Sequence, residues 1–86
     1  MTMIDSMHYP NYFPIKIIGI NHDDFIQQIM ESLNNSKVVF DDKIDTNFSK
    51  SKKYISVTVN VYINSREHFI EIYNELNNIS LTRFII

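Results

Sequence analysis

The sequence predicts an α+β sandwich in which two helices pack on one face of a four-stranded antiparallel sheet. Three observations lead to this fold class. Residues alternate strictly between apolar and polar at 54–63, two other stretches have one apolar stripe at helical spacing, and the elements follow the order strand, helix, strand, strand, helix, strand. Because each helix has a single stripe, both must share one sheet face. Right-handed crossovers then give strand order 4-1-3-2, the ferredoxin-like βαββαβ arrangement.

The first strand is predicted at 13–20, where "FPIKIIGI" is apolar on much of both faces, as in a central strand. Pro14 lies near its start, where a missing N–H is tolerated. Gly19 lies near its end and permits a bulge or close packing of helix on strand. The alternative for Gly19 is a ligand contact in the loop that follows the strand.

The first helix is predicted over 21–35. Asn21 is the expected cap, and Asp23 and Asp24 favour the first turn through the helix dipole. The predicted buried stripe comprises Phe25, Ile26, Ile29, Met30 and Leu33.

The middle of the chain predicts a hairpin. Alternate residues from Val38 to Phe48 would share one face of a strand, and the aspartates of this stretch indicate an exposed edge. A polar "SKSKK" turn leads into the strand at 54–63. The residues predicted to face the helices are Ile55, Val57, Val59, Val61 and Ile63.

The second helix is predicted over 64–79, because Asn64 and Glu67 have the spacing of a capping box. Its expected buried stripe is Phe69, Ile72, Tyr73 and Leu76. The last strand is "SLTRFII", at 80–86.

Composition bounds the function. The chain has 86 residues and a net charge of −2, which is unfavourable for binding nucleic acid. It has no cysteine, which excludes disulfides and thiolate chemistry and fits a cytoplasmic location. We expect one domain at 9–86 after a flexible tail at 1–8, without a signal peptide or membrane span.

Three segments of the chain resemble the YbeD-like, or lipoate-regulatory-protein-like, family of small bacterial proteins. The first is an aromatic–Pro pair followed by an apolar strand that contains Lys and Gly. The second is a polar turn followed by a strand with the pattern Tyr-x-Ser-Val-Thr. The third is a helix that ends in Tyr-x-x-Leu, followed by an apolar last strand. The matching residues are Tyr9-Pro10, Phe13, Lys16, Ile17-Ile18 and Gly19, then Tyr54, Ser56, Val57 and Thr58, then Tyr73, Leu76 and "RFII".

This resemblance covers Tyr9 to Ile86. It implies a ferredoxin-like fold similar to that of ACT regulatory domains, and it implies no chemistry and no catalytic residue. Lys52 departs from the pattern, because relatives often carry glycine in the hairpin. That departure leaves the type of turn open.

No metal site or cofactor is predicted. His8, His22 and His68 fall on separate elements, whereas a metal needs convergent ligands. The acidic residues do not follow an EF-hand pattern, and helix starts and an edge strand explain them better. These acids are Asp23, Asp24, Asp41, Asp42 and Asp45.

Two functions known for this topology require particular residues at defined positions. Acylphosphatases need an arginine in the loop after the first strand, and here that loop is "GINHDD". RNA-recognition motifs stack bases on aromatic residues at the centre of the sheet, where this chain has Ser56, Thr58 and Asn60. A basic cluster, Lys50, Lys52 and Lys53, fits a solvated hairpin.

We therefore expect a small non-enzymatic regulatory or interaction domain that acts through a protein partner or a small-molecule ligand, as a monomer or weak homodimer. The alternative is a nucleic-acid-binding domain. The expected contact residues are Lys16, Ser56 and Thr58 on the open sheet face, and Gly19, Asn21 and His22 in and after the end of the first strand.

Overall fold

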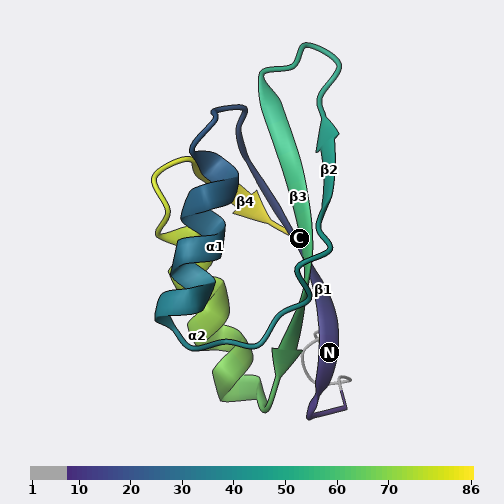
Figure 1. The fold of residues 1–86 in the computed structure, drawn as a ribbon, viewed down its shortest axis with the longest axis vertical. Coiled ribbons are helices and arrows are strands. Elements are labelled where there is room, and N and C mark those ends of the chain that lie inside the picture. The colour runs from purple at the N-terminus through teal and green to yellow at the C-terminus, as the bar shows by residue number, and fades with distance from the viewer. Residues whose placement is uncertain (1–7) are drawn as a thin grey trace.

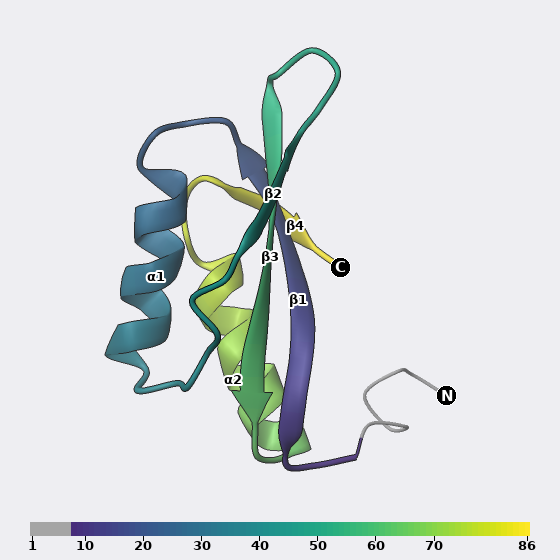
Figure 2. The same ribbon diagram turned by 45° about the vertical axis from the view of Figure 1, so that its right-hand side comes forward.

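A four-stranded antiparallel sheet and two helices form the two layers of the computed structural model, which describes residues 8–86 (Figure 1). Both helices lie on the same side of the sheet (Figure 2). The sheet order β2-β3-β1-β4 confirms the predicted 4-1-3-2. Residues 1–7 of the expected tail lie outside the described residues. In chain order, the elements are β1 (Asn11–Ile20), α1 (Phe25–Asn35), β2 (Asp45–Phe48), β3 (Tyr54–Ile63), α2 (Arg66–Asn77) and β4 (Thr82–Ile85).

The core lies between the helices and the inner face of the sheet. Val57 and Val59 of β3 are fully buried, as is Ile29 of α1, and Phe69 of α2 packs against them. The predicted faces of β3 are therefore confirmed. Of the predicted helix stripes, Tyr73 is wrong, because it is 38% exposed. The buried helix residues are Phe25, Ile29, Leu33, Ile72 and Leu76.

The first helix begins four residues later than predicted, at Phe25, and Asn21 does not cap it. The Asn21 side chain instead donates to the carbonyl of Lys52 (2.9 Å), and its backbone N–H donates to Lys53 (3.0 Å). Asp24 is the cap residue without a side-chain capping bond, and its N–H donates to Nδ1 of His22 (3.0 Å). Asp24 lies at the cap and Asp23 just before it, so neither is inside the first turn, although the carboxylate of Asp24 is still at the positive end of the helix dipole.

The second helix is capped by Ser65, one residue after the predicted Asn64. Ser65 Oγ accepts from the N–H of His68 (3.1 Å), and Nδ1 of His68 accepts from the N–H of Asn64 (3.0 Å). The pair resembles a capping box with histidine in place of Glu or Gln, except that His68 accepts from the residue before the cap and not from the cap residue itself.

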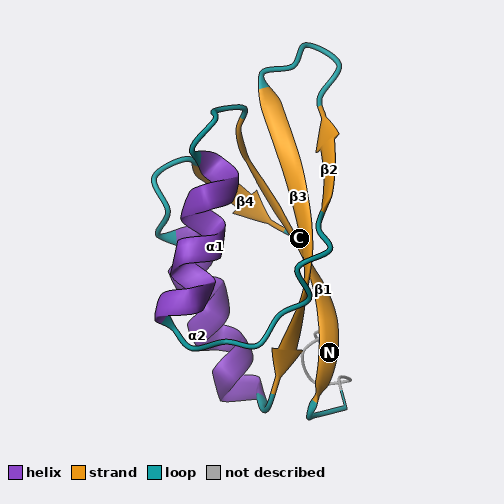
Figure 3. Cartoon of the chain, in the orientation of Figure 1, coloured by secondary structure: helices purple, strands orange, loops and turns teal. Residues whose placement is uncertain are grey.

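The predicted long strand at 38–48 is mostly loop. Only Asp45–Phe48 pair with β3, while Phe40 forms one isolated bridge to Val61. Asp41 turns the chain, because its Oδ1 accepts from the N–H of Lys43 (2.9 Å). The strand that does form is exposed and lies at the sheet edge, as the aspartates predicted. Its hairpin with β3 extends beyond the helices (Figure 3).

Part of the edge of β1 that faces β4 has no free hydrogen-bond donor, and Pro14 is one reason. Lys16 and Ile86 exchange both backbone hydrogen bonds (3.4 and 2.9 Å), so the polar backbone groups of Lys16 point toward β4. Backbone groups of every second residue point to the same side of a strand, so the nitrogens of Pro14 and Tyr12 also point to this edge, at positions that β4 does not reach. Pro14 has no N–H, and the N–H of Tyr12 donates to Oδ1 of Asn11 (2.8 Å). These two positions offer no free donor to an added strand.

Candidate functional site

The face of the sheet away from the helices carries most of the predicted contact residues. Strand pairing sets its side chains in rows that cross the sheet from β2 toward β4. The central rows are Asp45–Thr58–Lys16 and Asn47–Ser56–Ile18–Phe84, and Tyr54–Ile20 follows toward the hairpin.

Polar side chains occupy the centre of this open face. Lys16 is exposed and pairs directly with Thr58, whose neighbour on the other side is Asp45. Ser56 lies one row away, and its hydroxyl donates to the carbonyl of Asn47 (3.4 Å). Lys16, Ser56 and Thr58 are therefore neighbours on one surface.

The other predicted contact residues do not join them. Gly19 is buried, and a side chain there would meet the Phe25 ring and the carbonyl of Leu81. Asn21 and His22 are exposed in the loop before α1, where the Asn21 side chain bonds Lys52 of the β2–β3 turn and the His22 side chain accepts from Asp24. Gly19, Asn21 and His22 therefore lie apart from the group formed by Lys16, Ser56 and Thr58, and the contact role of each group stays a prediction.

Two hollows adjoin at Ile18. The first, with a volume of about 220 Å³, lies toward β2, and its polar walls come from Lys16, Asn47 and Ser56. The second, of about 540 Å³, lies toward β4 and is lined by Ile18, Tyr54, Arg83 and Phe84. We refer to this second hollow as the Arg83 cavity. Among residues 8–86, no carboxylate lines either hollow.

A β-bulge brings Arg83 to the open face. Ile18 pairs with Phe84, but the next residue of β1, Gly19, pairs with Thr82, so Arg83 is an extra residue in β4. Simple alternation would place Arg83 and Phe84 on opposite faces, whereas both line the same cavity. The sequence analysis missed Arg83. Gly19 was the one signal for a bulge, and it did not indicate which residue of the neighbouring strand would be redirected.

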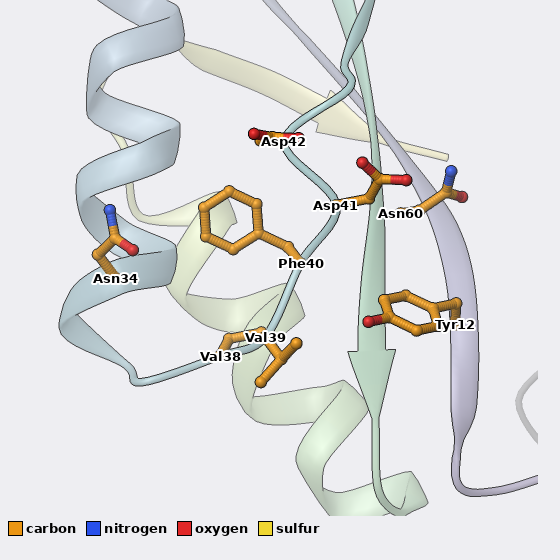
Figure 4. Close-up of a pocket in the computed structure, with 8 residues that line it drawn as sticks. All are labelled: Tyr12, Asn34, Val38, Val39, Phe40, Asp41, Asp42 and Asn60. Carbon is orange, nitrogen blue, oxygen red and sulfur yellow. The ribbon is translucent and has the colours of Figure 1, made fainter.

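A hollow larger than these two lies elsewhere, where the segment before β2 passes β3 (Figure 4). It measures about 790 Å³ and contains the carboxylates of Asp41 and Asp42. Figure 4 shows the Phe40 ring and the Tyr12 ring on opposite sides of this segment. One oxygen of Asp41 already holds the local turn. Within residues 8–86, no group of three or more His, Asp or Glu side chains is placed to hold a metal.

Comparison with known proteins identifies the family. The family described as "Protein of unknown function (DUF493)" matches residues 5–86. The chain belongs to this family. A UPF0250 protein of Janthinobacterium sp. (strain Marseille) is 30% identical over 81 residues, with 93% of this chain and 89% of the relative covered. A UPF0250 protein of Shewanella oneidensis is 31% identical over 83 residues, with 95% and 92% covered. The YbeD-like resemblance is thereby confirmed.

Two solved structures share the DUF493 fold seen here. Protein HP0495 from H. pylori has a TM-score of 0.78 at 20% identity, and the match covers 93% of this chain and 85% of that one. The ACT domain from GTP pyrophosphokinase of Chlorobium tepidum has a TM-score of 0.69 at 12% identity, covering 88% and 97%. The expected similarity to ACT domains is confirmed at the level of the fold.

Neither the family description nor the names of these relatives assign an enzymatic activity. Among the helices in residues 8–86, none has the length and apolar character that crossing a bilayer requires.

Proposed function

We propose that this chain is a small non-enzymatic regulatory or interaction domain that binds a protein partner or a small-molecule ligand through the open sheet face. The observation that carries the proposal is the asymmetry of the sheet. Both helices cover one face, whereas among residues 8–86 no helix or strand covers the other face, which has two hollows around Ile18. A cytoplasmic location is part of the proposal.

The ACT neighbour supports this proposal by its context. That protein is a domain of an enzyme, GTP pyrophosphokinase, so a fold of this shape serves there as a module of a larger protein. We infer that this chain likewise uses a docking surface. In this chain, the open face carries both charged and apolar side chains, and Tyr54 and Phe84 there are 42% and 54% exposed.

The proposal is tested by affinity capture from the native cell with a charge reversal on the open face. We expect Lys16→Glu to lose partners that the unchanged chain captures, because Lys16 projects from the centre of this face. Lys43→Glu makes the same charge reversal at an exposed position in the loop before β2 and should capture normally. Equal recovery of every captured protein with both variants would count against the open face as the functional surface.

We further predict a monomer or weak homodimer. Lys16, Ser56 and Thr58 interrupt the apolar part of the open face, and an obligate dimer needs a larger continuous apolar surface. The edge of β1 beyond β4 is closed to strand addition by Pro14. Sedimentation over a range of concentrations should therefore show monomer on dilution. A dimer that persists at nanomolar protein would contradict this prediction.

A further inference from the structure

We propose that the Arg83 cavity docks an acidic segment of a partner protein in which a bulky apolar side chain lies next to an Asp or Glu. The inference rests on the proposed function and specifies the chemistry of the partner. It follows from three properties of the cavity: apolar walls, a guanidinium held by hydrogen bonds, and a lining that includes no carboxylate of residues 8–86.

The walls fit a bulky apolar side chain. Ile18 is half-buried on β1 and lies between Tyr54 of β3 and Phe84 of β4, both of which are exposed. A volume of about 540 Å³ is within the range of sites that accept a compact ligand group. Burying such a group against two aromatic rings removes apolar surface of both partners from water, which is the main source of affinity.

The guanidinium of Arg83 is already held in place by hydrogen bonds within the chain. Nη1 of Arg83 donates to the carbonyls of Ser80 (3.1 Å) and Thr82 (3.3 Å). These acceptors are neutral, so they orient the guanidinium without cancelling its charge. Within residues 8–86, no carboxylate forms an ion pair with Arg83. Its remaining N–H groups match a carboxylate, and a fixed donor loses less entropy on binding than a free side chain.

A second cation lies close by on the same face. Lys16 is two residues before Ile18, on the same side of β1, and lines the adjoining hollow. Two cations beside an apolar cavity whose described lining has no carboxylate are complementary to a segment that combines acidic and apolar side chains.

Nucleic acid fits this arrangement less well. The exposed carboxylate of Asp45 lies in the same row as Lys16 and Thr58, where it would repel a phosphate chain that crossed the sheet. The centre of the face also carries Ser56 and Thr58 where base stacking requires aromatic rings. A short acidic segment confined to the β1–β4 side avoids Asp45.

The test is fluorescence anisotropy with a labelled synthetic peptide that carries one Phe flanked by Asp and Glu. We expect the peptide to bind the unchanged chain. Arg83→Gln should weaken binding about tenfold or more, because it removes charge-assisted hydrogen bonds. Lys43→Gln removes the same charge in the loop before β2, at an exposed residue that lines neither hollow, and should leave binding unchanged. Thermal melting of both variants checks that the fold is intact. If Arg83→Gln fails to fold, Phe84→Ser tests the same cavity and should also weaken peptide binding.

Two control probes define the chemistry. A peptide with Lys in place of the acids, and one with Ala in place of Phe, should each bind at least about tenfold more weakly than the acidic Phe peptide. Equal binding by Arg83→Gln and Lys43→Gln, no binding of the acidic Phe peptide, or tighter binding of a mixed RNA oligonucleotide would overturn the proposal.

If the peptide fails while cellular capture still depends on Lys16, the open face remains the functional surface and only the partner chemistry is wrong. If the peptide binds but capture does not depend on Lys16, the proposed function fails and the cavity assignment stands.

Discussion

Val59→Asp is expected to abolish cooperative folding. Val59 is fully buried in the middle of β3 and pairs with buried Ile15. An aspartate there would place an unpaired charge, or a protonated acid without partners, inside the core at a cost of several kcal/mol. A domain of this size has a free energy of unfolding of about 5–10 kcal/mol, and this single change removes most or all of it. Circular dichroism during thermal melting should show no folded baseline at room temperature.

Thr58→Asp is the matched control, one residue away on the opposite face. Thr58 is only half-buried, and its cross-strand neighbours are Lys16 on one side and Asp45 on the other. The new carboxylate would gain one attractive and one repulsive neighbour, each worth less than about 1 kcal/mol. We expect a small change in melting temperature. If the two variants melt alike, the assignment of the β3 faces is wrong.

The fold could be predicted because its main determinants are local. The strict alternation around Val57 and Val59 defines β3, and the single stripes of the helices leave one way to bury them. These signals depend only on which residues are apolar and how they are spaced. The sequence therefore contained the element order, the sheet order and most of the core.

The helix starts could not be predicted as well, because capping depends on competing partners. Asn21 has the right chemistry for a cap, but its side chain bonds Lys52, 31 residues further along the chain. At α2, Asn64 and Ser65 are both competent caps, and Ser65 takes the role. Local propensity cannot rank such choices when a tertiary contact or a one-residue shift decides them.

The candidate site was predicted only in part for a related reason. Lys16, Ser56 and Thr58 follow from alternation, which the structure obeys along β1 and β3. Arg83 does not, because the bulge breaks alternation in β4 at that residue. A bulge is a property of two paired strands, so neither strand alone reveals which side chain it redirects.

Gly19→Ala tests the close packing that accompanies this bulge, and two effects of opposite sign compete. In an ordinary strand, replacing Gly by Ala stabilises by roughly 0.5–1 kcal/mol, because glycine loses more chain entropy on folding. Gly19 does not have a positive φ, so alanine meets no backbone strain here. A Cβ at this position would, however, clash with the Phe25 ring and lie 2.6 Å from the carbonyl oxygen of Leu81. The backbone of Leu81 cannot move freely, because this same oxygen accepts from the N–H of Ile20 (3.0 Å).

We expect the clash to win, with a net loss of about 1–3 kcal/mol in the free energy of unfolding, measured by urea denaturation. Ser56→Ala, on the open face of the same sheet, introduces an alanine without such contacts and should change stability much less. A double-mutant cycle with Phe25→Leu separates the two contacts. A smaller loss for Gly19→Ala in the Phe25→Leu background assigns part of the cost to the ring, and the remainder belongs to Leu81. A Gly19→Ala chain as stable as the unchanged protein would show that chain entropy, and not close packing of α1 and the bulge, governs this position.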